Sequence, residues 1–340
     1  MYNLEPGLSV IVPIYNVEKY VEKSIRSILN SKLKYLKVIV IDDHGTDRSM
    51  KIVENLAKVD SRISIFHNDK NRGLAYSRNH GIEKVTTTYM AFLDSDDWVC
   101  PGFYDLLMDS AIHDDSDIAA GQVIYSYPKS GKEQYGWVSY WSFLNQKKIL
   151  SNSHDKQNII FACACWNKIY RTSLIHKYGL RFPINLYIED IPFTFLTTAL
   201  ANKISVVKEA KLYYLQRSNS IMKSLKTSKR VFDIFQVMKI TYSDLHKLPI
   251  EMRANYKQIL DHFWIFNLIN WSSQIEAPFQ QDFEKTVRNK LSKINPGNNP
   301  YIFGEHLQIY LTFMKTPCKY NLLLFNRLQI CTITKSWLTE

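Results

Sequence analysis

The chain has 340 residues, and its 43 Lys and Arg outnumber its 32 Asp and Glu, so the formal net charge is +11. This length is enough for one or two domains with a large buried core. The longest apolar runs fall well short of the roughly 20 residues that a membrane-spanning helix needs. The N-terminus lacks the basic and apolar segments of a signal peptide. The sequence therefore predicts neither a transmembrane segment nor a leader.

The basic balance agrees with three classes of partner: nucleic acid, an anionic membrane surface, or an anionic small substrate. The sequence has no block of five or more Lys and Arg, no zinc-finger spacing and no RNP motif, which argues against nucleic acid. The five cysteines are odd in number, and Cys163 and Cys165 are too close together for an ordinary disulfide. This usage indicates a reducing, cytoplasmic setting, with peripheral contact to the inner face of the membrane left open.

Strands and helices alternate through the first half of the chain. Apolar runs rich in β-branched residues predict strands, and apolar residues at helical spacing predict helices. We expect Asn16 to cap the first helix, Thr46 or Asp47 to cap the second, and Gly81 to close the third. Strands are predicted at residues 8–16, 35–43, 62–68, 89–94 and 117–127, and helices at 17–29, 46–58, 73–82 and 102–112.

This order predicts an α/β fold with a mostly parallel sheet and helices on both faces. After about residue 130 the alternation breaks down, and from residue 229 the pattern is helical. Residues 256–273 are apolar nearly all round, which predicts a buried helix. We therefore predict an α/β domain at 1–224 and a helical region at 225–340. Acceptor binding, membrane docking, oligomerisation and a plain helical core all remain open for that region.

Carboxylates directly follow two of the predicted strands. Asp42 and Asp43 end the second strand, and Asp94 and Asp96 follow the fourth within YMAFLDSDDW. Ligands of parallel sheets bind beyond the carboxyl ends of the strands, so these side chains are expected at one edge. A solvated acidic turn is the simple alternative. Mg²⁺ and Mn²⁺ prefer such oxygen ligands together with phosphate, so the pattern also fits a half-made cation site.

Four sequence blocks, in this order and at these intervals, resemble the family 2 glycosyltransferases, whose nucleotide-sugar-binding fold is called GT-A. The likeness is dense over residues 7–125 and continues through three later segments. The blocks are SVIVPIYNVEKYVEKSIRSIL from residue 9, VIVIDDHGTDRS from 38, NRGLAYSRNHGI from 71 and FLDSDDW from 92, followed by ACWNKIYRTSLI from 164, YIEDIPFTF from 187 and YYLQRSNSIM from 213.

The resemblance implies a donor site at the ends of the first strands. Pro13, Tyr15 and Asn16 would border the nucleotide base. Asp43 would accept a hydrogen bond from the base imide or the ribose, with an Asx turn as the alternative. Arg78 would lie near the base and phosphates, with a solvated helix arginine as the alternative.

The resemblance also implies roles around the diphosphate. Asp94 would hold the ribose, and Asp96 would ligate the Mn²⁺ or Mg²⁺ that bridges both phosphates and assists the leaving group. Asp97 would support this turn or be solvated. Arg217 would contact the diphosphate, since Arg suits phosphate geometry, with a surface arginine as the alternative.

One block departs from the family pattern. The family usually reads Asp-Asp-Gly-Ser after the second strand, whereas this chain has Asp42, Asp43, His44 and Gly45. The glycine has moved one place and the serine is lost, which puts a typical hydroxyl contact in doubt. His44 then either lines the donor pocket or is a plain loop histidine.

The segment YIEDIPFTF supplies the candidate base. Glu189 and Asp190 precede Pro192, which suits the first turn of a helix, and Asp190 alone would be predicted to be an N-cap. The pair matches the family's Glu-Asp motif, which implies that Asp190 deprotonates the acceptor hydroxyl. Glu189 and Trp166 would then bind the acceptor, although Trp166 fits a hydrophobic core equally well.

The resemblance thus implies an inverting, metal-dependent glycosyltransferase that uses a nucleotide diphosphate sugar, with UDP as the default. The acceptor would be a glycan or lipid-linked glycan of bacterial capsule, lipopolysaccharide or exopolysaccharide. The chain lacks the transmembrane helices and Q-x-x-R-W motif of processive synthases, which favours transfer of one sugar per encounter. Two alternatives stay open: a non-catalytic nucleotide-sugar-binding or scaffold protein, and, less well supported, a nucleotidyltransferase.

Overall fold

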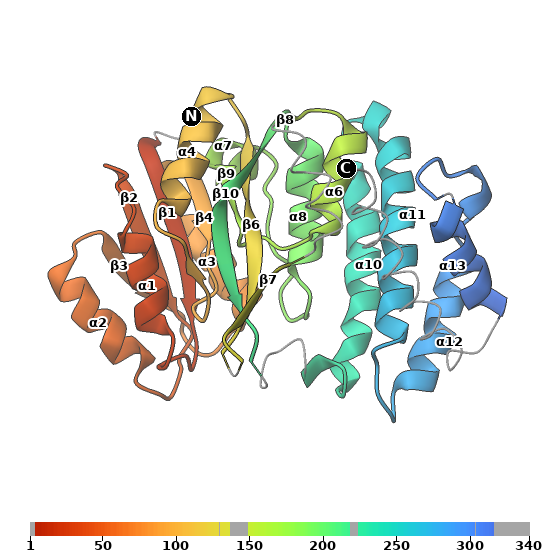
Figure 1. Ribbon diagram of the computed structural model, residues 1–340, viewed down its shortest axis with the longest axis horizontal. Coiled ribbons are helices and arrows are strands. Elements are labelled where there is room, and N and C mark those ends of the chain that lie inside the picture. Colours follow the sequence, from red (N-terminus) through yellow and green to blue (C-terminus); the bar gives the residue numbers. More distant parts are fainter. Residues whose placement is uncertain (1–3, 129, 137–148, 218–223, 303, 316–340) are drawn as a thin grey trace. The chain divides into compact units, whose positions relative to one another are not determined.

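The computed structural model describes residues 4–128, 130–136, 149–217, 224–302 and 304–315. The chain divides into two compact units, residues 1–217 and 218–340. The first is an α/β fold on one mixed sheet, and the described part of the second is helical (Figure 1). Among the described helices, none is both long and apolar enough to cross a membrane. The YYLQRSNSIM segment beyond Arg217 lies outside the described residues up to position 223.

The sheet of the first unit has ten strands in the order β3-β2-β1-β4-β9-β6-β10-β5, with β7 paired to β6 and β8 to β10. Each of the neighbouring pairs among β3, β2, β1 and β4 is parallel, as predicted. β9 runs antiparallel between β4 and β6. The strands are β1 Glu5–Ile14, β2 Leu36–Asp42, β3 Ile63–His67, β4 Thr87–Phe92, β5 Trp98–Val99, β6 Ile118–Tyr127, β7 Lys132–Tyr135, β8 Ile149–Leu150, β9 Lys168–Arg171 and β10 Ile204–Leu215.

Helices flank this sheet (Figure 1). α3 packs on β1 and β2, α4 packs on β6 and β10, and α1 contacts both α2 and β5. Residues 191–200 of α8 are all buried, so this helix is a core element. The helices of the first unit are α1 Val21–Leu29, α2 Ser49–Val59, α3 Leu74–Lys84, α4 Phe103–His113, α6 Ser153–Phe161, α7 Thr172–Lys177 and α8 Asp190–Leu200.

The core lies where the apolar runs predict it. Val10 and Val12 of β1 and Val38 and Val40 of β2 are completely buried. Burial of one such side chain stabilises the fold by about 1.5 to 3 kcal/mol. These strands are covered on both faces, which is why their sequences read as continuous apolar runs without polar alternation.

Two predicted helix caps are wrong. α1 begins at Val21 with Tyr20 as its N-cap, and Asn16 lies in a left-handed turn with φ 51°. Gly81 lies inside α3, which runs on to Lys84. A Cβ at Gly81 would lie 2.3 Å from Ile11 Cγ2, so the glycine permits the close approach of α3 to β1 and does not end the helix.

The start of α2 follows the prediction in part. The helix begins at Ser49, later than the pattern indicates. Asp47 Oδ1 accepts a hydrogen bond from the Ser49 backbone N–H at 2.9 Å. Asp47 therefore satisfies a donor of the first turn, whereas Thr46 does not.

The second unit is helical from residue 229, as the sequence predicts. Helix α11, Ile250–Ser272, is buried along much of its length, and Phe263 and Trp264 are completely buried, which confirms the predicted core helix. Short 3₁₀ turns accompany its longer helices: Lys229–Phe232 precedes the first of them, and Asp244–Lys247 and Pro296–Asn298 lie between later ones. The longer helices are α10 Asp233–Ser243, α11 Ile250–Ser272, α12 Gln280–Leu291 and α13 Gly304–Lys315.

Candidate active site

The carboxyl ends of β1, β2 and β4 lie at one edge of the sheet, because β1 is the parallel neighbour of both other strands. Pro13 is buried near the end of β1, and Tyr15 follows the strand with 50% of its surface exposed. Asp43 follows β2, and Asp94 follows β4 closely. The structure therefore brings these four predicted donor-site residues to the same edge.

Asn16 ties the loop after β1 to the loop after β2. Its Oδ1 accepts a hydrogen bond from the Thr46 backbone N–H at 2.7 Å. In the other direction, Asp47 Oδ2 accepts from the Glu18 backbone N–H at 2.8 Å. The observed role of Asn16 is to fix the shape of this edge, and its contact with a donor stays a prediction.

The altered glycine position has a local physical explanation. His44 has φ 55°, the left-handed conformation that glycine adopts without steric cost, and it occupies the position where the family pattern has glycine. Its backbone N–H donates to Asp42 Oδ1 at 3.0 Å, and its Nε2 hydrogen-bonds to the Asn68 carbonyl. A Cβ at Gly45 would lie 2.9 Å from Asn16 Oδ1. The glycine is thus required one residue later, where the two loops approach closely.

The Asp43 carboxylate is only 3% exposed and holds the loop before α3. Oδ1 accepts hydrogen bonds from Asn68 Nδ2 at 2.7 Å and the Arg72 backbone N–H at 2.8 Å. Oδ2 accepts from the Gly73 backbone N–H at 2.8 Å. These bonds do not form the predicted local Asx turn, which Asp42 makes instead with His44. A direct contact of Asp43 with a nucleotide stays a prediction.

Arg78 joins two segments of the site, the turn after β4 and the residues at the start of α8. It is 2% exposed, so the alternative of a solvated helix arginine is wrong. Its guanidinium donates to Asp94 Oδ1 at 2.6 Å and to Glu189 Oε1 at 2.7 Å. Nε has no hydrogen-bond partner among the described residues. Arg78 thereby connects the turn after β4 to the start of α8. Glu189 lies 111 residues after Arg78 in the chain.

The turn of residues 94–97 presents its carboxylates in different ways. Asp96 Oδ2 pairs with the Arg217 guanidinium at 2.6 Å, so Arg217 lies at the predicted diphosphate region. Asp97 is 1% exposed, and its Oδ1 accepts from the Leu215 backbone N–H at 2.8 Å. Burial, with the nearby Asp96 and Asp94, raises the pKa of Asp97 well above its ordinary value. Asp97 is therefore a structural residue, which is the supporting role expected for it.

The donor set of this turn fits a hard divalent cation that shares its ligands with phosphate. The side chains of Asp94 and Asp96 are 23% and 17% exposed. No group of three or more His, Cys, Asp and Glu gathers for a metal within the residues that the structure describes. Mg²⁺ commonly uses one or two carboxylates and completes its shell with water and substrate phosphates. Asp96, with Asp94 beside it, matches that arrangement.

Asp190 is the first residue of α8, as Pro192 indicates, but it is not the N-cap. Glu189 takes that position without a side-chain capping bond, and Ile188 before it has φ 63°. A β-branched residue in this conformation is strained, a feature that concentrates at functional sites. The Asp190 carboxylate is half-buried and accepts no hydrogen bond from another described residue. Burial, together with Glu189 and Asp94 and against Arg78, raises the pKa of Asp190 to about 7.

A buried turn at residues 162–165 supports the first turn of α8. All four of its carbonyls accept hydrogen bonds from side chains, an arrangement that sequence reasoning missed. Lys168 is 1% exposed, and burial lowers its pKa to about 8. Lys168, which closely follows the apolar run IIFACACW of residues 159–166, is the one signal that could have shown this turn. The bonds are Lys168 Nζ to Ala162 O at 3.3 Å and to Ala164 O at 2.5 Å, Thr194 Oγ1 to Cys163 O at 2.8 Å, and Tyr170 OH to Cys165 O at 2.9 Å.

Thr194 lies one helical turn after Asp190, so its bond to Cys163 fixes the start of α8 against this turn. Trp166 follows the turn directly and is 6% exposed, with its ring 5.2 Å from the ring of Tyr214. The core alternative therefore describes its present surroundings. Its contact with an acceptor stays a prediction.

Comparison with known proteins identifies relatives along much of the chain. Residues 9–179 match the sequence model of Glycosyl transferase family 2. The cholesterol galactosyltransferase of Borreliella burgdorferi is 30% identical over 302 residues, which cover 82% of this chain and 81% of that protein. GlyA of Streptococcus pneumoniae is 29% identical over 94% of this chain, but the match spans 47% of its own length. The minor teichoic acid biosynthesis protein GgaB of Bacillus subtilis is 26% identical over 84% of this chain and 32% of its own.

The fold also matches a solved structure. The crystal structure of S. aureus TarS residues 1–349 with UDP-GlcNAc superposes with a TM-score of 0.75 and 21% identity, covering 95% of this chain and 91% of that one. This likeness supports the α/β architecture with a helical C-terminal region. Taken with the sequence match over half of the chain, it leads to one conclusion: the chain belongs to glycosyl transferase family 2.

Proposed function

We propose that this chain is an inverting, metal-dependent glycosyltransferase that moves a sugar from a UDP-sugar to a glycan or lipid-linked acceptor during synthesis of a bacterial surface polysaccharide. The observation that carries the proposal is the Asp190 carboxylate. It is half-buried, free of hydrogen bonds from other described residues, and has its pKa raised to about 7. It lies next to Glu189, which Arg78 links to Asp94.

In the proposed reaction, Asp190 accepts the proton of an acceptor hydroxyl as that oxygen forms its bond to the anomeric carbon. The bond between this carbon and the diphosphate oxygen breaks, and the nucleoside diphosphate leaves from the opposite face. Attack from one face and departure from the other inverts the anomeric configuration. A base with a pKa near the working pH combines the required ionised form with useful basicity.

The leaving group needs positive charge beside it. Asp96, with Asp94, would hold Mn²⁺ or Mg²⁺, which supplies Lewis-acid neutralisation of the diphosphate when it is bound. Arg217 already lies 2.6 Å from Asp96. Its guanidinium can donate two parallel hydrogen bonds to phosphate oxygens, which suits it to hold the departing diphosphate.

The relatives support the choice of donor and acceptor class. The TarS structure contains UDP-GlcNAc, which favours a UDP-sugar here. The name of GgaB refers to teichoic acid, which favours a surface glycan as the acceptor. The basic balance of the chain suits an anionic or lipid-linked acceptor at the cytoplasmic face of the membrane. We assign the helical C-terminal region, placed at 225–340, to acceptor binding, membrane contact or self-association.

Two measurements on wild-type protein and Asp190→Asn test the proposal. A panel of nucleotide diphosphate sugars, each with Mn²⁺ and with chelator, should raise the thermal midpoint of both proteins for one donor and only with metal. Sugar transfer to a surface-glycan acceptor should fall by about 10²- to 10⁴-fold in the variant, because a general base contributes about that factor. Transfer at the wild-type rate would remove Asp190 from the mechanism, and no shift with any donor would favour a non-catalytic role.

A further inference from the structure

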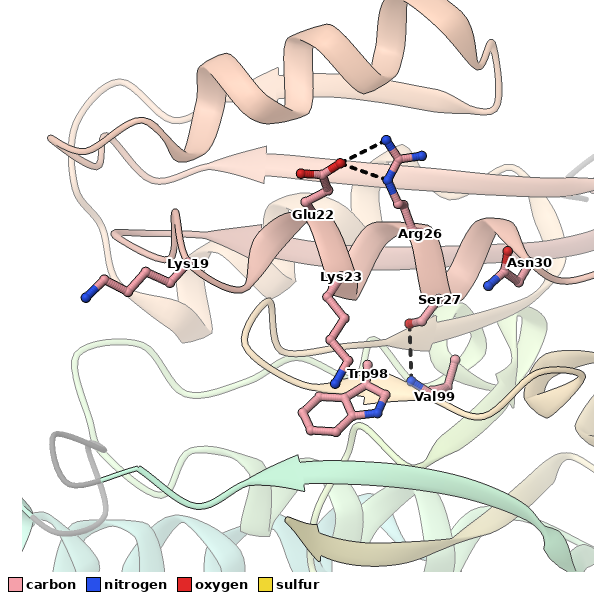
Figure 2. A pocket seen from close by; sticks show the side chains of 8 residues that line it. All are labelled: Lys19, Glu22, Lys23, Arg26, Ser27, Asn30, Trp98 and Val99. Atoms are coloured by element: carbon pink, nitrogen blue, oxygen red, sulfur yellow. Dashed lines mark hydrogen bonds and ion pairs between the residues drawn. The ribbon is translucent and has the colours of Figure 1, made fainter. Parts of the chain in front are cut away.

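A groove with a volume of about 540 Å³ lies between α1 and β5 (Figure 2). It does not include Arg78 or the carboxylates of Asp94 and Glu189 that pair with it, a set that we call the Arg78 network. Residues 19–30 of α1 and its preceding turn form one wall, and Trp98 and Val99 form the other. The Val99 backbone N–H donates to Ser27 Oγ at 3.2 Å, which fixes the two walls to each other. We call this feature the α1–β5 groove.

The α1–β5 groove is basic. Lys19, Lys23 and Arg26 line it, against Glu22 as its one carboxylate. Glu22 pairs with Arg26 at 2.8 Å, which neutralises that arginine. Within the described part of the chain, neither Lys19 nor Lys23 has a carboxylate within 4.0 Å. The groove therefore presents two ammonium groups without an ion pair, although Glu133 of β7 is close enough to Lys23 to act on its pKa.

Trp98 gives the groove a fixed aromatic wall. One face of its indole stacks on Tyr213, with ring centroids 5.4 Å apart and an interplanar angle of 6°. The Lys23 ammonium lies 3.0 Å from the centre of the ring (Figure 2). Tyr213 and the Lys23 ammonium therefore both cover the indole, and its face opens to a sugar ring only when the flexible lysine stem moves its charge from the ring to an incoming anion.

The groove begins beside the candidate active site. Trp98 directly follows Asp97 in the turn of residues 94–97. The ring of Tyr20, which follows the lining residue Lys19 in the chain, lies 5.6 Å from the Arg217 guanidinium. From there the groove follows α1 toward Asn30 (Figure 2). A chain bound along it would have one end near the carboxylates and the rest leading away over basic residues.

We propose that the α1–β5 groove binds a phosphate-bearing glycan, holding the anionic chain of the acceptor while its end is glycosylated. This inference rests on the proposed function, since it assigns the acceptor class of that site. A membrane surface fits less well, because none of the groove residues is among the exposed large apolar side chains that would insert into lipid. Nucleic acid fits less well, because one aromatic platform beside a sugar-transfer site offers little to a run of stacked bases.

The test measures the binding of full-length protein to a polyglycerol phosphate oligomer. Tryptophan fluorescence and calorimetry give the affinity. Comparison probes are an uncharged maltooligosaccharide of equal length, phosphatidylglycerol vesicles and a single-stranded oligonucleotide. Lys19→Met with Lys23→Met should weaken oligomer binding by roughly fivefold to thirtyfold, at about one exposed charge contact each. Lys51→Met, an exposed lysine on α2, is the matched control and should bind as the wild type does.

Several outcomes would overturn the proposal. Equal affinity for the uncharged probe, or an unchanged affinity in the double variant, would show that the groove does not bind phosphate. Tighter binding of vesicles or oligonucleotide than of the oligomer would assign the groove to a membrane or to nucleic acid. The donor-dependent thermal shift is measured on the same variants and should be unchanged. Absence of the donor-dependent shift in wild-type protein would contradict the proposed function. Absence of oligomer binding in wild-type protein that does show the shift would contradict only the proposed role of the groove.

Discussion

The carboxylates near the carboxyl ends of β1, β2 and β4 differ in their partners. Asp94 and Glu189 share the buried guanidinium of Arg78, and Asp96 pairs with Arg217. Asp190, which begins α8 beside Glu189, has no such ion pair among the described residues. Asp43 and Asp97 also lack an ion pair there, but backbone N–H groups donate hydrogen bonds to their carboxylates, whereas Asp190 accepts none from another described residue.

This difference separates two requirements of the proposed chemistry. An arginine partner fixes the direction of a carboxylate and lowers its pKa, which suits binding and support, although burial still raises the pKa of Glu189 and of Asp96 above their ordinary values. A base must instead gain a proton from its substrate, and a cation held against it would oppose that step. Burial without a direct partner raises the pKa of Asp190 to about 7, where proton transfer at neutral pH is most effective.

Removing the Arg78 guanidinium, which Asp94 and Glu189 share, should have the largest effect on stability. Arg78→Met leaves Asp94 and Glu189 without their partner, and breaking a buried ion pair costs about 3 to 5 kcal/mol in the free energy of unfolding. Urea unfolding measures this loss. Because Arg78 also connects the turn after β4 to α8, sugar transfer should be lost even under conditions where the variant is folded.

Arg26→Met is the matched control for that experiment. Arg26 pairs with Glu22 on the surface of α1, with both side chains more than half exposed. A surface pair of this kind contributes less than about 0.5 kcal/mol. If Arg78→Met destabilised the protein no more than Arg26→Met, the Arg78 network would not hold the two segments of the site together.

The next effect is the pH dependence of transfer. In the proposed mechanism Asp190 acts as a base in its ionised form, and its pKa is raised to about 7 by burial, Glu189 and Asp94. The value of kcat/KM should therefore rise about tenfold per pH unit below pH 7 and level off above it. Measurement between about pH 5 and pH 9 checks this. A plateau already present at pH 5 would indicate an ordinary aspartate with a pKa of about 4.

The same shift predicts a pH-dependent change in stability. The folded-state pKa of Asp190 lies above the unfolded value, so protonated Asp190 favours folding, and this contribution is lost as pH rises through about 7. Asp190→Asn keeps the neutral form at every pH. Its thermal midpoint relative to wild type should thus be higher at pH 8 than at pH 5. An identical difference at both pH values would show that Asp190 is ionised without cost in the folded protein.

The sheet edge formed by β1, β2 and β4 could be predicted because its signals are local in sequence. Strands β1, β2 and β4 each appear as an apolar run, and parallel neighbours place their carboxyl ends together. Asp43 and Asp94 could therefore be assigned to one edge from strand order alone. The caps were harder, since Asn16 and Gly81 serve contacts between segments that no local pattern contains.

The surroundings of Glu189 and Asp190 depend on contacts between distant residues. No periodicity shows that Arg78 reaches Glu189, or that Lys168 and Thr194 hold the carbonyls of the buried turn before β9. β9 itself is four residues long and enters the sheet antiparallel, so no alternating pattern predicted it. Asp190 was found through the family motif, whereas its surroundings required the structure.

The smallest effect on stability is expected for the partly exposed ion pair between Arg217 and Asp96. The side chains of Arg217 and Asp96 are 28% and 17% exposed, so their ion pair should contribute less than about 1 kcal/mol to stability. Arg217→Met should leave the thermal midpoint nearly unchanged. It should free Asp96, and Mn²⁺ binding without donor, measured by electron paramagnetic resonance, should strengthen up to about fivefold. Binding of the donor should weaken at the same time, because the diphosphate loses its arginine. If Mn²⁺ affinity stayed at the wild-type value, Arg217 would not compete with a cation for Asp96, and the assignment of the metal to this carboxylate would lose its support.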